Sequence, residues 1–135
     1  MNYWDRVRAN NFDRLVGQIQ TEKVMELGVG DSILDIGCGV GQYTPQFLYR
    51  FKRVVGLDPS KDYLKEARSV GWRIEYIEGW GETFKLDEEF DTISMNNLLE
   101  HVDDPVALLI NCKKHLAPKG RIRSEERRVG KECRL

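Results

Sequence analysis

Short apolar runs and amphipathic stretches alternate along most of the chain. Short apolar runs bounded by glycine, proline or aspartate are typical of buried strands, whereas apolar residues that recur every three or four positions are typical of helices. The apolar runs predict strands over residues 32–36, 53–57, 74–77 and 90–95, with a fifth strand beginning at Ile122 after a turn at residues 118–120.

Three helices are predicted between these strands, over residues 41–51, 60–71 and 105–116. The pair Asp104-Pro105 is a capping residue followed by proline at the first helical position, a typical helix start. Each helix should turn one apolar face toward the sheet. The residues expected on these faces are Tyr43, Phe47, Leu48 and Phe51 on the first helix, Tyr63, Leu64, Ala67 and Val70 on the second, and Val106, Leu109, Cys112 and Leu116 on the third.

The segment before the first strand also has a helical pattern, over residues 5–27. Thr21 is placed to cap a second short helix within it. We therefore expect residues 1–30 to form an N-terminal helical cap, preceding a core at residues 31–122. The apolar positions that define its helices are Phe12, Leu15, Val16 and Ile19, then Val24, Met25 and Leu27.

Strands that alternate with helices predict an α/β fold. Parallel neighbouring strands need a crossover connection, and these crossovers are right-handed. The expected architecture is a Rossmann-like, doubly wound parallel sheet. Ligands of such sheets bind at the carboxyl ends of the strands, so the candidate site residues should directly follow the apolar runs.

The most informative motif is residues 35–41, DIGCGVG, which follows the first apolar run. Its glycines at alternate positions permit a tight turn and a close approach of the backbone to a ligand. The carboxylate of Asp35 disfavours a pyrophosphate there but suits a ligand with a positively charged amino group. Asp58 ends the second apolar run, where a carboxylate can accept hydrogen bonds from both hydroxyls of a ribose.

These residues resemble the class I methyltransferases that depend on S-adenosylmethionine (SAM). The resemblance covers about residues 30–122 and includes residues 90–105, FDTISMNNLLEHVDDP, and 116–122, LAPKGRI. It implies SAM as cofactor and methyl transfer to an oxygen, nitrogen or carbon nucleophile of a small molecule, as in the subgroup that contains quinone-pathway O-methyltransferases. The family's sheet has seven strands, so this chain is expected to be truncated within the fifth.

The resemblance also assigns roles to individual residues. It implies that Asp35 holds the amino group of SAM and that Asp58 holds the ribose. The alternatives are that Asp35 is only a helix or turn partner and that Asp58 caps the helix that follows it. Relatives usually carry Gly-Asp-Ala after the third strand, where the Asp binds adenine; Trp80 stands at that position here, either stacking on adenine or simply packing. The predicted cofactor-binding set is Asp35, Gly37, Cys38, Gly39, Gly41, Asp58, Trp80, Gly81, Glu82 and Asn96.

His101 is the candidate catalytic residue, as a general base beside a substrate hydroxyl. The alternative is a structural role, in which His101 caps its loop or packs against it. Some quinone-pathway relatives place an acid and this histidine around a metal, but Asn97 stands where their first acid aligns, so we predict no metal site. Tyr3 and Trp4 are candidates for a lid over the cofactor.

Composition and charge narrow the possible partners. The net charge of −1 supplies no electropositive surface for nucleic acid. No apolar run is long enough to span a bilayer, and the N-terminus lacks the apolar core of a signal peptide. The three cysteines form no disulfide framework, and Cys38 is interpreted as a small residue that fits its turn, so we expect a cytoplasmic protein.

Three functions are alternatives to SAM-dependent methyl transfer. An NAD-dependent oxidoreductase shares the architecture, but its fingerprint needs a glycine where Gln42 stands. A nucleic-acid methyltransferase that flips bases would carry an Asn/Asp-Pro-Pro-aromatic loop where residues 96–99 read NNLL. The third alternative is a non-catalytic fragment of a cofactor-binding fold.

Residues 123–135 differ in character from the rest of the chain. Most of them are charged, whereas buried parallel strands are nearly continuous apolar runs. Residues 123–133 resemble the translation of a DNA-sequencing adapter, so we interpret the segment as an artefactual tail that stays in water. The fourth strand should then form an open edge of the sheet.

Overall fold

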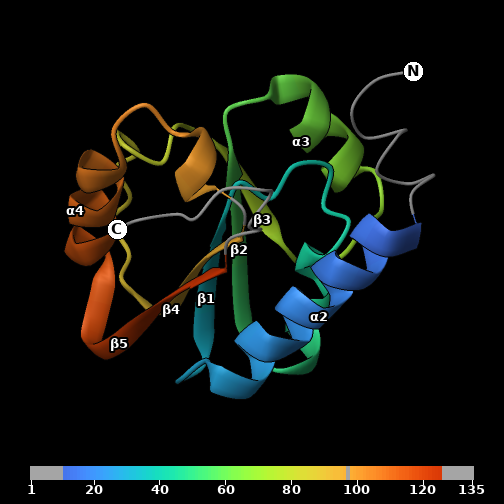
Figure 1. Ribbon diagram of the computed structural model, residues 1–135, viewed down its shortest axis with the longest axis horizontal. Coiled ribbons are helices and arrows are strands. Elements are labelled where there is room, and N and C mark those ends of the chain that lie inside the picture. The colour runs from blue at the N-terminus through green and yellow to red at the C-terminus, as the bar shows by residue number, and fades with distance from the viewer. Residues whose placement is uncertain (1–10, 97, 126–135) are drawn as a thin grey trace.

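Five parallel strands form one sheet at the centre of the computed structural model, which describes residues 11–96 and 98–125 (Figure 1). The strand order is β3-β2-β1-β4-β5. The predicted parallel α/β sheet is therefore confirmed, with β1 at its centre between β2 and β4. The strands are β1 (Ser32–Ile36), β2 (Arg53–Asp58), β3 (Glu75–Glu78), β4 (Phe90–Asn96) and β5 (Leu116–Glu125).

Helices lie on both faces of this sheet, as a doubly wound fold requires (Figure 1). Helix α4 covers one face, while α2, α3 and the 3-10 helix η1 lie on the other. A second 3-10 helix, η2, follows β4. The bounds are α2 (Asn11–Leu27), η1 (Thr44–Tyr49), α3 (Lys61–Arg68), η2 (Leu99–His101) and α4 (Pro105–Lys114).

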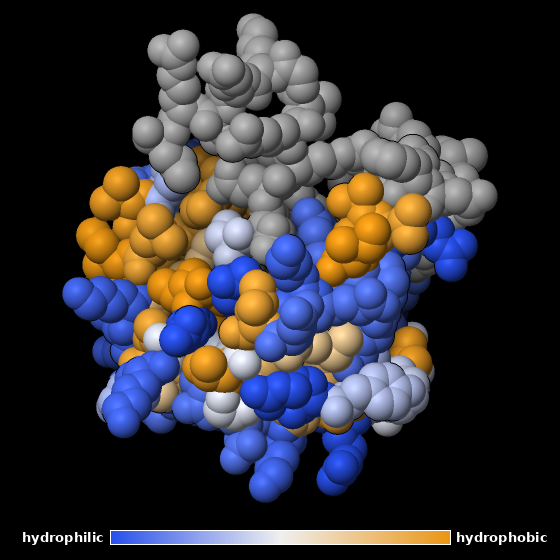
Figure 2. All heavy atoms as spheres, turned by 60° about the horizontal axis from the view of Figure 1, so that its bottom comes forward, coloured by the Kyte–Doolittle hydropathy of each residue, from blue (hydrophilic) through white to orange (hydrophobic). Residues whose placement is uncertain are grey.

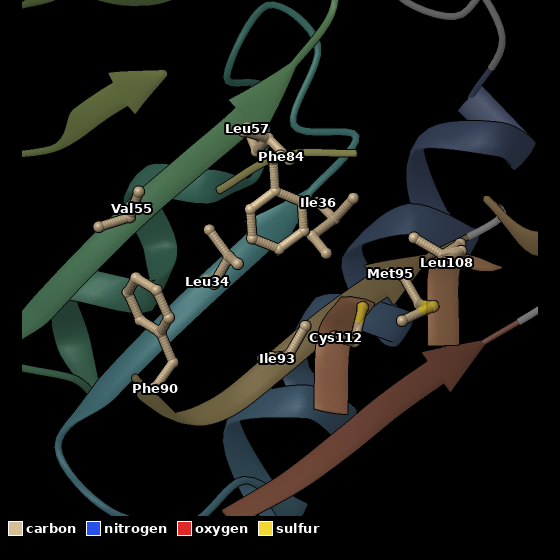
Figure 3. Packing of buried hydrophobic residues seen from close by; sticks show 10 residues of the cluster. All are labelled: Leu34, Ile36, Val55, Leu57, Phe84, Phe90, Ile93, Met95, Leu108 and Cys112. Atoms are coloured by element: carbon tan, nitrogen blue, oxygen red, sulfur yellow. The ribbon is translucent and has the colours of Figure 1, made fainter. Parts of the chain in front are cut away.

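The core is split between the two faces because successive strand residues point in opposite directions. Ile33 packs with Val24 of α2 and Phe47 of η1 on one face. Leu34 and the other members of the larger cluster pack on the opposite face, against α4 (Figure 3). That cluster consists of Leu34, Ile36, Val55, Leu57, Phe84, Phe90, Ile93, Met95, Leu108 and Cys112.

The helix starts predicted near residue 60 and at Asp104-Pro105 are confirmed. The side chain of Ser60 accepts a hydrogen bond from the backbone N–H of Tyr63 at 3.2 Å. Asp104 accepts one from Ala107 at 3.0 Å, ahead of Pro105. These caps satisfy N–H groups that have no partner within the helix.

Several predicted faces and boundaries of the helices are wrong. The helix expected over residues 41–51 is only the 3-10 helix η1, because the glycine turn occupies its first residues. Val70, Val106 and Leu109 are exposed rather than inward. Helix α4 instead buries Leu108, Asn111 and Cys112, since its polar residues find partners in the loop between β3 and β4.

Helix α2 is one continuous helix, so the prediction of a break capped by Thr21 is wrong. The hydroxyl of Thr21 donates to the backbone carbonyl of Gly17 within the helix, at 2.8 Å. Leu15 and Ile19 of the predicted apolar stripe are exposed, whereas Val24 is buried. The proposed lid residues Tyr3 and Trp4 lie outside the described residues.

Strand β5 is longer than predicted. It begins at Leu116 and continues through residues 123–125, which the sequence analysis assigned to a tail outside the sheet. Arg123 is paired with Ser94 and Ser124 with Met95, so the prediction that β4 forms the open edge is wrong. An edge strand pairs through its backbone, so residues 123–125 can join β4 without the continuous apolar run of a central strand. Residues 126–135 lie outside the described residues.

The register of β5 is irregular near its start. It shifts between Phe90 and Thr92 of the partner strand, and the predicted turn at residues 118–120 lies inside the strand at this point. Lys119 has a φ of 66°, a left-handed conformation that costs an L residue with a side chain about 1–2 kcal/mol. The strand therefore carries local strain.

The surface mixes apolar and charged groups. Figure 2 shows hydrophobic residues gathered in several groups between hydrophilic ones. Apolar residues of α4 are among the exposed ones, with Val106 66%, Ile110 53% and Leu109 40% accessible. Within the described ranges, no helix combines the length and the apolar character that a bilayer crossing requires.

Candidate functional site

The glycine motif forms a turn tied to the end of β2 by backbone hydrogen bonds. The N–H groups of Gly37 and Cys38 donate to the carbonyl of Leu57, at 2.7 and 3.1 Å. Gly37, Gly39 and Gly41 all have positive φ, between 58° and 78°. A side chain at these positions is strained, so the backbone conformation itself accounts for the alternating glycines.

Gly41 is needed for packing as well as for conformation. A Cβ atom at Gly41 would lie 2.7 Å from the Oη atom of Tyr76 and 3.2 Å from the Cβ of Ala67. At Gly37, by contrast, a Cβ atom would lie 3.3 Å from the side chain of Leu98. Gly41 thus lets the turn rest on α3 and β3, while Gly37 faces the loop that follows β4.

Asp35 lies in the interior of the site, at the centre of the sheet. Its carboxylate accepts hydrogen bonds from the hydroxyls of Thr44, at 2.7 Å, and Ser94, at 3.0 Å. Burial nevertheless raises the pKa of Asp35 from 3.8 to about 6, and the nearby charge of Asp58 adds to this rise. The ionised carboxylate is therefore costly here, and a cation placed near it would relieve that cost.

Asp58 joins the glycine turn to the start of α3. Its Oδ2 atom accepts a hydrogen bond from the N–H of Gly39 at 3.0 Å, and its Oδ1 atom accepts one from Ser60 at 2.9 Å. Each carboxylate oxygen can accept further hydrogen bonds. Asp58 therefore holds the turn in place and keeps acceptor capacity at the carboxyl end of β2.

A pocket opens at this edge of the sheet, where β1, β2 and β4 end. It is an open hollow, and its lining residues come from the segments that follow these strands and β3. Five residues predicted from sequence line it together: Gly37, Trp80, Gly81, Glu82 and His101. The other predicted residues, Asp35, Cys38, Gly39, Gly41, Asp58 and Asn96, are not part of this lining.

The sequence analysis missed several lining residues. Leu57, Leu98 and Val102 supply apolar walls, and Asp103 adds a carboxylate near His101. The only sequence signal for them is their position directly after a strand end or next to a predicted site residue. Thr44 and Ser94, the partners of Asp35, were also missed, because a hydroxyl gives no pattern that distinguishes it from an ordinary surface residue.

The remaining predicted residues are placed as follows. Trp80 is 63% exposed, so one face of its ring is open to a ligand or to solvent. Asn96 is half-buried at the end of β4, and its Oδ1 atom is buried without a hydrogen-bond partner. Burial raises the pKa of the Cys38 thiol far above its usual range, so it stays protonated and packs against Gly56.

His101 is exposed in η2 at the mouth of the pocket. Among the described residues, no three histidine, cysteine or carboxylate side chains come close enough to hold a metal ion. Asn97 and the side chain of Glu100 lie outside the described parts of the chain. The geometry thus places His101 where an acceptor molecule could reach it.

Fold and site together define a Rossmann-like domain with a small-molecule pocket at the carboxyl edge of its sheet. Comparison with known families makes the assignment specific, since residues 34–123 match the family model described as a methyltransferase domain. The chain belongs to this methyltransferase family.

Individual relatives agree with this assignment. A ubiquinone biosynthesis O-methyltransferase of Aliivibrio fischeri is 32% identical over 99 residues, which are 69% of this chain and 42% of that protein. Its counterpart in Idiomarina loihiensis is 35% identical over 99 residues, 69% of this chain and 41% of that protein. The chain thus spans about two fifths of the length of the curated relatives it matches.

Solved structures share the fold. N-methyltransferase NodS of Bradyrhizobium japonicum, in complex with S-adenosyl-L-homocysteine, superposes with a TM-score of 0.74 at 25% identity, covering 87% of this chain and 63% of that one. DesVI of Streptomyces venezuelae superposes with a TM-score of 0.74 at 23% identity, covering 80% of this chain and 50% of that one.

Proposed function

We propose that the protein transfers a methyl group from SAM to a small-molecule acceptor. The observation that carries this proposal is the single pocket lined by Gly37, the Trp80–Glu82 loop and His101, which come from three separate strand ends. Membership of the methyltransferase family supports the same reaction. The ubiquinone-pathway relatives are named as O-methyltransferases, so an acceptor that is methylated on oxygen is the first to test.

Bound SAM would supply an electrophilic methyl group on a sulfonium. The chain's own task is to hold that carbon in line with a nucleophile, because proximity and orientation account for much of the rate of such a displacement. Gly37 allows the close backbone approach, and Asp58 supplies acceptors for the ribose hydroxyls. Asp35 holds the amino group through its negative charge, which burial leaves poorly compensated.

Other residues of the predicted set complete the proposed site. The exposed ring of Trp80 stacks on the adenine, with Gly81 and Glu82 beside it. The unpartnered Oδ1 of Asn96 accepts a hydrogen bond from the methionyl part. His101 accepts the proton of an acceptor hydroxyl at the pocket mouth, which is the role of a general base.

Titration of the protein with SAM tests the cofactor assignment. Asp58→Ala should weaken SAM binding at least about tenfold, because hydrogen bonds to a charged group contribute about 1.5–3 kcal/mol each. Asp62→Ala, which removes an exposed carboxylate from the first turn of α3, is the matched control. Calorimetry that finds equal SAM affinity in wild type and Asp58→Ala would refute the assignment.

The alternatives differ in the ligand they require. An NAD-dependent oxidoreductase should bind nicotinamide dinucleotides in this pocket, and titration with NAD separates it from the proposed enzyme. A non-catalytic fragment should show no methyl transfer to any acceptor even when SAM binds. The free, buried thiols of Cys38 and Cys112 fit a reducing compartment, and we place the reaction in the cytoplasm.

A further inference from the structure

Helix α4 buries two polar side chains against the loop that forms one wall of the pocket. Asn111 and His115 lie one helical turn apart and are only 9% and 6% exposed. Buried polar groups are costly unless they are hydrogen-bonded, so their partners show what this face of the helix does. All of those partners outside α4 belong to residues 81–86.

Asn111 binds the backbone of this loop at two points. Its Nδ2 group donates to the carbonyl of Gly81 at 3.0 Å and to that of Phe84 at 2.9 Å. One amide group therefore uses both of its hydrogens to hold two carbonyls three residues apart. Gly81 is itself part of the pocket lining.

His115 binds the loop at a third point and is held in one tautomer. Its Nδ1 atom lies 2.8 Å from the carbonyl of Asn111, and because a carbonyl only accepts, Nδ1 carries the hydrogen. Nε2 is then the acceptor for the N–H of Leu86, at 3.1 Å. The ring also packs on Phe84, with centroids 4.3 Å apart.

The loop lies too close to α4 at Gly81 to leave room for a side chain. A Cβ atom at Gly81 would lie 2.5 Å from the Cδ1 of Leu108 and 3.3 Å from Ile36. Gly81 thus permits the close approach, while Asn111 and His115 hold the loop at this distance by hydrogen bonds. Between these restraints, residues 80–82 form the pocket wall.

We propose that Asn111 and His115 are positioning residues that set the Trp80–Glu82 wall and thereby the cofactor affinity of the site. The proposal rests on the proposed function, since the ligand of that wall is SAM. Neither side chain lines the pocket. The link to the lining is the hydrogen bond from Asn111 to the backbone carbonyl of Gly81. Their effect on binding is therefore indirect, through the loop.

Two substitutions of His115 separate positioning from packing. His115→Gln places a carboxamide oxygen near the position of Nε2 and keeps an acceptor for Leu86. His115→Asn instead places an N–H donor near the position of Nδ1 and loses that acceptor. Both variants lose the ring contact with Phe84, so a difference between them reports the hydrogen bond to the loop.

The affinity for S-adenosyl-L-homocysteine, measured by calorimetry, is the first readout. We expect His115→Asn and Asn111→Leu to bind about tenfold more weakly than wild type, and His115→Gln to stay within about threefold. Lys114→Asn, at an exposed position of the same helix, is the control. Equal affinities in His115→Gln and His115→Asn would overturn the proposal.

Hydrogen exchange of the ligand-free protein is the second readout and does not depend on the cofactor. Residues 79–86 should exchange faster in His115→Asn and Asn111→Leu than in His115→Gln, while β1 and β2 remain protected. Exchange that rises equally in β1 would overturn the positioning role. If wild type binds neither SAM nor S-adenosyl-L-homocysteine, the proposed function fails. The exchange comparison alone then decides whether Asn111 and His115 position the loop.

Discussion

At the scale of single residues, the buried carboxylate of Asp35 lowers the stability of the fold when it is ionised, and the same charge is proposed to bind the ligand. Its carboxylate is buried at the centre of the sheet, and its hydrogen-bond partners within the described ranges are two hydroxyls. Its pKa, about 6, means that the folded protein binds a proton there more tightly than the unfolded chain does. The stabilisation from this proton is full below pH 3.8 and is lost as the pH rises through about 6.

Asp35→Asn removes this pH dependence. The free energy of unfolding of the variant, relative to wild type, should rise by about 2.4 kcal/mol between pH 4 and pH 7, because each unit of pKa shift corresponds to about 1.4 kcal/mol and part of the effect is already lost at pH 4. Wild type should gain SAM affinity over the same range as its carboxyl ionises, so the affinity of the variant relative to wild type should fall. Denaturant titrations at several pH values check the first result; a difference that does not change with pH would show that the carboxyl titrates normally.

Lys119 is a second residue whose backbone conformation has a measurable cost. Lys119→Gly should raise the free energy of unfolding by about 0.5–1 kcal/mol, because glycine adopts its φ of 66° without strain and only part of that gain is lost to the greater freedom of the unfolded chain. Lys52→Gly removes the same side chain where φ is not positive, and it should destabilise. Chemical denaturation that places both variants below wild type would contradict this.

At the scale of elements, helix α2 and the segment after the glycine turn meet at Gly17. A Cβ atom at Gly17 would clash with the ring and hydroxyl of Tyr43, which donates a hydrogen bond to the carbonyl of Arg14. Gln18 and Gln46 exchange side-chain hydrogen bonds of 2.7 and 2.8 Å between the same two elements. The glycine therefore sets how closely α2 approaches the cofactor side of the sheet.

A double-mutant cycle measures this contact. In a Tyr43→Ala background, Gly17→Ala should stabilise the protein by about 1 kcal/mol, the usual gain from replacing a helical glycine. In wild type the same change should bring no gain or a loss, because Tyr43 must move. Urea denaturation of the four proteins gives the coupling energy, and a value near zero would show that the two residues do not interact.

At the scale of the whole molecule, α4 presents apolar residues on the side away from the sheet. Val106, Leu109 and Ile110 are exposed there, and exposed apolar patches favour association. The same helix binds the pocket loop with its opposite face. One helix thus supports the site with one face and exposes apolar side chains on the other.

Val106→Glu with Ile110→Lys should reduce self-association without loss of stability. The two positions are four residues apart and exposed, and glutamate near the helix start opposite lysine one turn later is a favourable pair. Light scattering at increasing concentration should fall severalfold, with an unchanged thermal midpoint. The matched pair Leu15→Glu with Ile19→Lys on α2 is the comparison; unchanged scattering in the α4 variant would contradict the prediction.

Much of the fold could be predicted because its signals are local. Apolar runs located β1, β2 and β4 to within a residue or two, and Ser60 and Asp104 marked two helix starts. The face of α4 could not be predicted, because Asn111 and His115 are buried by partners 27 to 30 residues earlier in the chain. Residues 123–125 were misplaced because strand pairing at an edge depends on the backbone and not on apolar side chains.

The tie between the glycine turn and β2 has a consequence for sequence divergence. The N–H groups of Gly37 and Cys38, together with the carbonyl of Leu57, are main-chain atoms, so this connection survives a change of side chain at position 57. The sequences of related chains can therefore diverge widely while the turn keeps its geometry. The TM-score of 0.74 at 25% identity is an example of a fold kept at low identity. Remote homologues should accordingly be sought by their positive-φ glycines and strand-end acids, not by shared strings of residues.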